Sequence, residues 1–275
     1  MAKYEKYSLA IGQEDWVRME AMNKICNPET LNFLKQKLWS GKTVADVGCG
    51  PGIMAVEWAK LVGESGKVYA IDISQEQLDL AKKYAQHYNI NNIEYICCPV
   101  HDLNSLSLQI DVVYSRFLLE HVHEQEAALK NMIDLLVNSG YLFCEALICF
   151  ESLFSDPHSK AFARWREATL LQPKLSDTDY YIGQKLFDLF KKNGVTPESY
   201  EIKQPIMFDK TIRKNFLIGL HGEEIQNKYV EKGFYSKKEI QIIAQDATTF
   251  SQTDCLWAFP QYVQIMGRKY EKNCS

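Results

Sequence analysis

The chain has 275 residues and a formal net charge of −4, with 46% hydrophobic and 24% charged residues. These fractions are ordinary for a globular protein and argue against a disordered or fibrous chain. A membrane-spanning helix needs about 20 consecutive, mostly apolar residues, and the sequence has no such stretch. Because it also lacks a basic stripe, neither a membrane nor duplex nucleic acid is expected as a partner.

The cysteines and the first residues bear on the cellular compartment. Eight cysteines are present, and two of them, Cys97 and Cys98, are adjacent. The segment from Met1 to Lys6 is polar and lacks the apolar core of a secretory leader. We therefore expect reduced thiols in a cytoplasmic protein. No metal is expected, because the sequence has neither a Cys-x-x-Cys pair nor a His/Cys cluster at zinc spacing.

The first forty residues predict helices, and a regular alternation of strands and helices follows. Pro28 is predicted to lie in the first turn of a second helix. Ser74 is predicted to cap a helix, and Ser139-Gly140 to form a turn. The expected strands are 43–47, 67–71, 93–97, 110–114 and 141–147, and the expected helices are 53–61, 74–88 and 124–136. This alternation predicts a parallel sheet with helices on both faces.

After Phe150 the alternation stops. Helices are expected over 157–171 and 180–192, a strand over 200–208, about fifty mostly helical residues, and a last strand over 258–266. A late strand after a helical insertion fits an edge hairpin on the sheet. We expect one domain over 1–275, with a helical cap (1–40), a core (41–150), an acceptor or lid region (151–257) and a terminal strand and tail (258–275).

A glycine-rich string joins the first expected strand to the following helix. It reads Asp46-Val47-Gly48-Cys49-Gly50-Pro51-Gly52. Glycines let a backbone adopt positive φ and approach a ligand closely, and open α/β sheets bind ligands at the carboxyl ends of their strands. A dinucleotide fingerprint would need a glycine where Ile53 stands, so a nicotinamide-dependent oxidoreductase is the weaker interpretation.

This string resembles motif I of class I S-adenosylmethionine-dependent methyltransferases. Further matches follow in the expected order, with the turn near Asn138 and Ser139 departing from the family's usual Lys and Pro. They comprise Asp72 after the second strand, Asp102 after the third, Asp111–Phe117 on the fourth, and Val137–Leu142. Looser matches to a small-molecule-type branch are Tyr7-Ser8-Leu9, Arg18, Arg116-Phe117, Glu145 and Ile182–Leu186.

The resemblance implies a doubly wound, mostly parallel seven-stranded sheet with helices on both faces, an N-terminal helical cover and a late helical insertion. It implies S-adenosyl-L-methionine as cofactor and S-adenosyl-L-homocysteine as product. Asp72 would accept from the ribose hydroxyls, and Asp102 from the adenine amino group. The implied cofactor-binding residues are Arg18, Asp46, Gly48, Cys49, Gly50, Gly52, Asp72, Ile73, Gln77, His101, Asp102, Ser115 and Arg116.

Each of these assignments has a plainer alternative. Asp72 could cap the following helix, Asp102 could form an Asx turn, and Arg116 could make a surface ion pair. Arg18 could lie on a solvated helix face. Methyl transfer is an in-line displacement that needs a general base only if the acceptor loses a proton.

The possible proton acceptors are Glu120, His121, His123 and Glu145, of which His121 and Glu145 are taken as the catalytic candidates, although a histidine at such a position often makes only local hydrogen bonds. The charge balance favours a small-molecule acceptor, and no Asn/Asp-Pro-Pro-Tyr/Phe motif follows the fourth strand. Aromatic residues in 150–257 suit an apolar metabolite held between that segment and the N-terminal helices, although most of them could simply form core. A macromolecular acceptor and a non-catalytic S-adenosylmethionine-binding protein remain as alternatives.

Overall fold

The computed structural model describes residues 13–176, 178–217 and 222–270, so the Tyr7-Ser8-Leu9 match lies outside the described residues. The chain divides into two compact units. The first takes its residues from the ranges 1–29, 149–180 and 204–261, and the second from 30–148, 181–203 and 262–275. That the two act as one domain stays a prediction.

The second unit is built on a seven-stranded sheet in the order β3-β2-β1-β4-β5-β10-β7. The pairs β2–β3, β1–β2, β1–β4 and β4–β5 are parallel, whereas β10 and β7 are antiparallel. The mostly parallel sheet and its late edge hairpin are therefore confirmed. The strands are β1 (Thr43–Val47), β2 (Lys67–Asp72), β3 (Ile93–Cys97), β4 (Ile110–Arg116), β5 (Leu136–Cys149), β7 (Val195–Lys203) and β10 (Gln261–Lys269).

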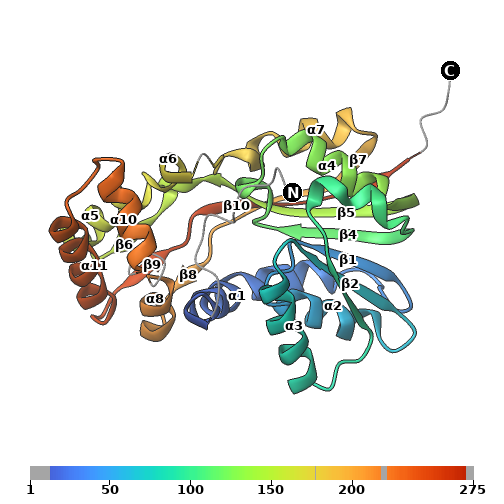
Figure 1. Cartoon of the computed structure of the whole chain (residues 1–275), viewed down its shortest axis with the longest axis horizontal. Helices are drawn as coiled ribbons and strands as arrows, with labels where there is room; N and C mark the ends of the chain where they lie inside the picture. Colours follow the sequence, from blue (N-terminus) through green and yellow to red (C-terminus); the bar gives the residue numbers. More distant parts are fainter. Residues whose placement is uncertain (1–12, 177, 218–221, 271–275) are drawn as a thin grey trace. The chain divides into compact units, whose positions relative to one another are not determined.

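Helices lie on both faces of this sheet. In Figure 1, α2 and α3 lie on one side, and α4 and α7 on the other. The strand order explains this, because β1 leads outward through β2 to β3 while β4 leads to β5 in the opposite direction, and right-handed crossovers then place their helices on opposite faces. The helices are α2 (Ile53–Val62), α3 (Gln75–His87), α4 (Gln125–Asp134) and α7 (Leu186–Lys192), with 3-10 turns η1 (Val100–Leu106), η2 (Leu119–His121) and η4 (Ile182–Gln184).

The core of the second unit is aromatic. Trp58 and Phe143 are fully buried, and the ring of Phe33 stacks on that of Phe143 with their centroids 4.9 Å apart. Trp39 packs edge-on against Trp58 at 5.5 Å. Large rings bury much apolar area with few rotatable bonds. This packing fixes the strands on which the carboxyl-end residues stand.

Ser74 begins α3 as predicted, because its hydroxyl accepts from the main-chain N–H of Gln77. Other boundaries were predicted wrongly. Pro28 does not start a helix: α1 runs unbroken over Gln13–Leu34 with Pro28 inside it. The lost main-chain donor at one position does not end a helix whose neighbouring turns keep their own bonds. The Ser139-Gly140 turn lies within β5, where Ser139 has φ 65° and the pairing with β4 shifts register.

The predicted strands 200–208 and 258–266 are each two strands. Pro205 and Pro260 lie at the breaks, and proline cannot donate to a sheet ladder. The helix predicted from Pro157 begins only at Lys160, where Ser159 caps it, and the one predicted from Tyr180 is mostly α7.

The first unit combines a small antiparallel sheet in the order β6-β9-β8 with helices. The buried Trp257 of β9 packs against Phe162 and Trp165, with ring centroids 4.9 Å and 5.2 Å away. None of the described helices in the chain is long and apolar enough to cross a membrane. The elements are β6 (Phe154–Asp156), β8 (Ile206–Met207), β9 (Leu256–Ala258), η3 (Phe150–Ser152), α5 (Lys160–Thr169), α6 (Gln172–Ser176), α8 (Lys210–Phe216), α10 (Glu223–Glu231) and α11 (Lys237–Ser251).

Candidate functional site

The glycine-rich string forms a tight turn between β1 and α2. Gly48, Gly50 and Gly52 have φ of 73°, 52° and 75°, which side chains rarely adopt. A Cβ on Gly52 would lie 2.5 Å from that of Ala81, so α3 could not pack there. The turn closes on β2, because the N–H groups of Gly48 and Cys49 both donate to the carbonyl of Ile71. The chain thus holds the turn beside the point where the strand order reverses.

Asp46 lies near the end of β1, directly before this turn, and is 2% exposed. The pKa of Asp46 is raised to about 7, chiefly by burial; the Arg116 charge acts to lower it, and the nearby carboxylates Asp72 and Glu145 act to raise it. Its Oδ2 atom is buried and has no hydrogen-bond partner among the described residues. A buried acid in this state gains from a nearby positive charge or hydrogen-bond donor.

Asp72 ends β2 and ties three segments together. Its Oδ2 accepts from the N–H of Gly50 at 2.9 Å, and its Oδ1 accepts from the N–H of Ser74 at 2.9 Å. Burial raises the pKa of Asp72, while these two main-chain donors act in the opposite direction. The structure thus combines the two interpretations of this residue: Asp72 supports the start of α3, and each oxygen retains a further lone pair for a ligand.

Two other predicted residues lie beside the end of β2. Ile73 follows Asp72 and is 43% exposed, which is unusual for a large apolar side chain. Gln77 lies in the first turn of α3 and is buried, and its Oε1 has no hydrogen-bond partner among the described residues. An exposed apolar side chain beside a buried acceptor suits a ligand with an apolar ring and polar substituents.

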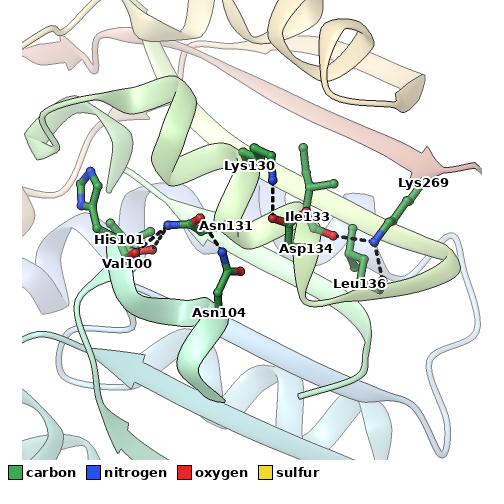
Figure 2. A network of polar contacts seen from close by, with 9 residues as sticks. All are labelled: Val100, His101, Asn104, Lys130, Asn131, Ile133, Asp134, Leu136 and Lys269. Carbon is green, nitrogen blue, oxygen red and sulfur yellow. Dashed lines mark hydrogen bonds and ion pairs between the residues drawn. The ribbon is translucent and has the colours of Figure 1, made fainter. Parts of the chain in front are cut away.

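The loop after β3 carries His101 and Asp102 in η1, and α4 holds it in place. Figure 2 shows Asn131 of α4 donating to the carbonyls of Val100 and His101, at 3.3 Å and 2.8 Å, and accepting from Asn104 at 3.0 Å. His101 Nε2 lies 2.9 Å from the carbonyl oxygen of His123. The Asp102 side chain is exposed, so its proposed contact with an adenine amino group stays a prediction.

The same helix is also held at its C-terminal end. Figure 2 also shows Lys269 of β10 donating to the carbonyls of Ile133 and Leu136, at 3.0 Å and 2.8 Å. A cation at a helix C-terminus satisfies carbonyls that have no partner within the helix. Helix α4 therefore links the loop after β3 to the last strand of the sheet.

The carboxyl end of β4 carries Ser115 and Arg116. Ser115 is buried, and its Oγ has no hydrogen-bond partner among the described residues. Arg116 pairs in register with Glu145 of β5, and its Nε lies 4.0 Å from Glu145 Oε2. The Arg116 side chain is only 10% exposed, so the alternative of a surface ion pair is wrong.

Glu145 is held by three side-chain donors. Its Oε1 accepts from Thr30 at 2.8 Å and from Gln264 at 2.7 Å, and its Oε2 accepts from the Tyr114 hydroxyl at 2.5 Å. Glu145 itself is 2% exposed. Each carboxylate oxygen therefore has a partner within the protein, which makes this residue a poor proton acceptor as the structure stands.

His121 occupies the end of η2, and its N–H donates to the carbonyl of Leu118 at 2.9 Å. The preceding Glu120 is buried and accepts from the N–H of Leu147 through Oε1 at 2.6 Å. A role for His121 in proton transfer stays a prediction. Arg18 belongs to the first unit, where its guanidinium lies 3.1 Å from the sulfur of Met22 and 3.4 Å from that of Met19. Its binding to a cofactor stays a prediction as well.

Several residues of this site escape sequence reasoning. Gln264 carried a usable signal, because it is a polar residue inside the apolar run Tyr262–Met266. Thr30, Tyr114 and Asn131 carried none, since their partners are distant in sequence. A shallow depression lined by residues such as Lys67 and Asn92 lies at the opposite, amino ends of β2 and β3. It takes no part in the site described above. Among the described residues, no His, Cys, Asp and Glu group has the composition to hold a metal ion.

Comparisons with known proteins agree with this geometry. The family described as "Methyltransferase domain" matches residues 44–140. A ubiquinone biosynthesis O-methyltransferase from Coxiella burnetii is 31% identical over 134 residues, which cover 47% of this chain and 56% of that protein. Its counterpart from Acinetobacter baumannii is 33% identical over 140 residues, covering 50% and 55%. The chain thus matches about half the length of these relatives.

Solved structures share the fold at low identity. An S-adenosylmethionine-dependent methyltransferase from Aquifex aeolicus matches with a TM-score of 0.51 and 18% identity, covering 69% of this chain and 92% of that one. The YcgJ protein of Bacillus subtilis matches with a TM-score of 0.57 and 14% identity, covering 88% and 97%. The matched segment, residues 44–140, spans the glycine-rich turn and the strands around it, and this part of the chain is a methyltransferase domain with the class I, Rossmann-like fold.

Proposed function

We propose that this protein transfers a methyl group from S-adenosylmethionine to a small-molecule acceptor. The observation that carries the proposal is the turn from Gly48 to Gly52, held between the buried Asp46 and the half-buried Asp72 where the strand order reverses. In open α/β sheets this is the place at which nucleotide-like ligands bind. The three glycines adopt positive φ and carry no Cβ, so a ligand can approach the turn backbone closely at these positions.

The residues present fit such a cofactor. Among the buried polar atoms that have no hydrogen-bond partner in the described part of the chain, Asp46 Oδ2, Gln77 Oε1 and Ser115 Oγ lie at or just after the carboxyl ends of β1, β2 and β4. Buried polar atoms in native proteins are almost always satisfied, so atoms of this kind point to a ligand. We assign Asp72 to the ribose hydroxyls, Asp46 to the positively charged methionyl end, and Asp102 to the adenine.

The chemistry asks little of the protein beyond alignment and exclusion of water. When bound, S-adenosylmethionine supplies an already activated methyl group, and S-adenosylhomocysteine is the product. The chain's residues would orient the donor by hydrogen bonds at Asp72 and by charge at Asp46. His121 is the remaining candidate for accepting a proton from the acceptor, because the oxygens of Glu145 are taken by Thr30, Tyr114 and Gln264.

A small acceptor is supported by the net charge of −4 and by the names of the curated relatives, which are O-methyltransferases of ubiquinone biosynthesis. We therefore propose an acceptor with a hydroxyl group and a largely apolar body. The aromatic residues of the first unit are compatible with such a guest, although Trp165 and Trp257 are themselves buried as core.

Isothermal titration with S-adenosylhomocysteine tests the proposal. We expect Gly50→Val to lower the affinity roughly 100-fold, or about 2.7 kcal/mol, because a branched side chain would occupy the path of the cofactor. Gly63→Ala is the matched control: Gly63 also has positive φ, but nothing lies within 4 Å of the added Cβ. A correctly folded Gly50→Val protein with wild-type affinity would refute the site. Failure of the wild type to bind would refute the proposed function.

A further inference from the structure

The hydrogen bonds around Glu145 join four separate segments of the second unit. Thr30 comes from the end of α1, Tyr114 from β4 and Gln264 from β10, while Glu145 itself stands on β5. Four separate segments thus converge on one carboxylate that is 2% exposed. Burying a carboxylate is unfavourable unless it is paired and hydrogen-bonded, and this arrangement gives the Glu145 carboxylate both kinds of partner inside the protein.

The same network reaches Arg116. The Thr30 hydroxyl donates to Glu145 and accepts from Arg116 Nη1 at 3.4 Å, while Arg116 Nε lies 4.0 Å from Glu145. Arg116 therefore contacts Glu145 both directly and through Thr30. Its guanidinium is fixed at the carboxyl end of β4 by a residue on the neighbouring strand.

Asp46 lies on the same face of the sheet. Asp46 pairs in register with Tyr114 of β4, and Arg116 pairs with Glu145 of β5. Residues paired across strands share a face, as do residues two apart along one strand such as Tyr114 and Arg116. One arginine is thereby placed between two buried carboxylates. Arg116, Glu145 and Asp72 are also the charged groups that act on the pKa of Asp46.

We propose that Glu145 is a positioning residue that engages the charge of Arg116, so that Asp46 keeps an uncompensated negative charge that selects the cationic methyl donor over its neutral-sulfur product. When Arg116 is paired with Glu145 and Asp46 is ionised, the three residues Asp46, Arg116 and Glu145 together carry a net charge of about −1. S-adenosylmethionine has a positive sulfonium where S-adenosylhomocysteine has an uncharged thioether. The excess charge therefore favours the donor and assists release of the product. This inference rests on the proposed function.

The test compares affinities for the two ligands by isothermal titration at pH 8, where Asp46 is ionised. In Glu145→Gln, Arg116 is left to neutralise Asp46, so the preference for S-adenosylmethionine over S-adenosylhomocysteine should fall about threefold to tenfold. In Arg116→Gln the excess negative charge grows, so the same preference should rise. Glu145→Asp keeps the charge and should retain the wild-type preference even if both affinities drop.

The matched control is Asp111→Asn. Asp111 lies at the start of β4, the strand that ends in Arg116, and its carboxylate accepts hydrogen bonds from Lys42 and Thr43. This substitution should leave the preference unchanged. An equal loss of both affinities in Glu145→Gln would overturn the proposal, because a purely structural residue would act on both ligands alike. If Glu145→Gln does not fold, the Arg116→Gln variant provides the test. An unchanged or lowered preference of that variant for S-adenosylmethionine over S-adenosylhomocysteine overturns the proposal. A wild type that binds neither ligand would instead refute the proposed function.

Discussion

Arg213 in the first unit and Glu145 in the second are both buried charges, but the chain satisfies them in different ways. Arg213 of α8 is fully buried and donates to four main-chain carbonyls, those of Met207, Phe208, Ser251 and Thr253. Glu145 is satisfied by side chains alone. The surroundings of a charge that is bonded only to main-chain carbonyls do not change their own charge once the chain has folded. A charge that is bonded to side chains can also interact with charged and titrating side chains nearby.

The difference separates a structural charge from a functional one. Arg213 joins the end of β8 to the end of α11, and each of its four hydrogen bonds ends on a carbonyl that cannot change its charge. Glu145 lies beside Arg116, which in turn acts on Asp46. A ligand charge near Asp46 can therefore act on Arg116 and, through it, on Glu145, whereas the four carbonyls bonded to Arg213 carry no such charge.

The largest effect is expected at Arg213. Replacing it by Met keeps most of the apolar stem but leaves four carbonyls without their donor, two of them in buried hydrogen bonds. We expect the free energy of unfolding to fall by about 3–5 kcal/mol, measured by urea denaturation. Arg164→Met is the control, because Arg164 and its partner Asp246 are both nearly half exposed. That substitution should change stability by less than about 0.5 kcal/mol. A loss at Arg213 no larger than this would contradict the structural role.

The sequence predicted the second unit far better than the first. Around the glycine-rich turn, the strands end in recognisable motifs, and the apolar pattern along the chain predicts the same strands and helices that the structure has. The bounds of β1, α2 and β3 were predicted to within one residue. In the first unit, short strands such as β8 and β9 pair only with each other and with β6. These strands pair with residues about fifty positions away, for β8 with β9, or about one hundred positions away, for β6 with β9, which no local periodicity can reveal.

The candidate site shows the same limit. Asp46 and Asp72 follow from spacing within a known motif, because the turn itself dictates where an acid can stand. The donors to Glu145 do not, since Gln264 and Thr30 lie more than one hundred positions from it. Sequence reasoning therefore named Glu145 but not the groups that occupy its oxygens, and so offered proton transfer where the geometry favours positioning.

Asp72 offers an intermediate case, since it is bonded to backbone N–H groups yet assigned to a ligand. Asp72→Ala should lower S-adenosylhomocysteine affinity by about 1–3 kcal/mol, because the ribose hydroxyls lose an acceptor and Gly50 loses its anchor. Calorimetry measures this. Ser74→Ala is the control: it removes the cap at Gln77 and should reduce stability by about 1 kcal/mol while sparing affinity. An unchanged affinity in Asp72→Ala would exclude the ribose assignment.

The smallest expected effect is the pH dependence set by Asp46. Because burial raises the pKa of Asp46 to about 7 in the folded protein, from 3.8, the fold retains a proton that the unfolded chain has lost. Stability from this group is therefore full below about pH 4 and declines as pH rises to about 7. Asp46→Asn should accordingly stabilise the ligand-free protein more at pH 8 than at pH 5.

Ligand binding should show the opposite trend with pH. A cationic donor favours the ionised form of Asp46, so its binding must expel the proton below pH 7 but not above it. We expect the affinity for S-adenosylmethionine to rise about fivefold between pH 6 and pH 8, and the rise to vanish in Asp46→Asn. Titrations in buffers of different ionisation enthalpy would show proton release at pH 6 and little at pH 8. If Asp46→Asn kept the wild-type pH dependence, another group would be titrating, and Asp46 would be a buried acid fixed by the fold in the same sense as Arg213.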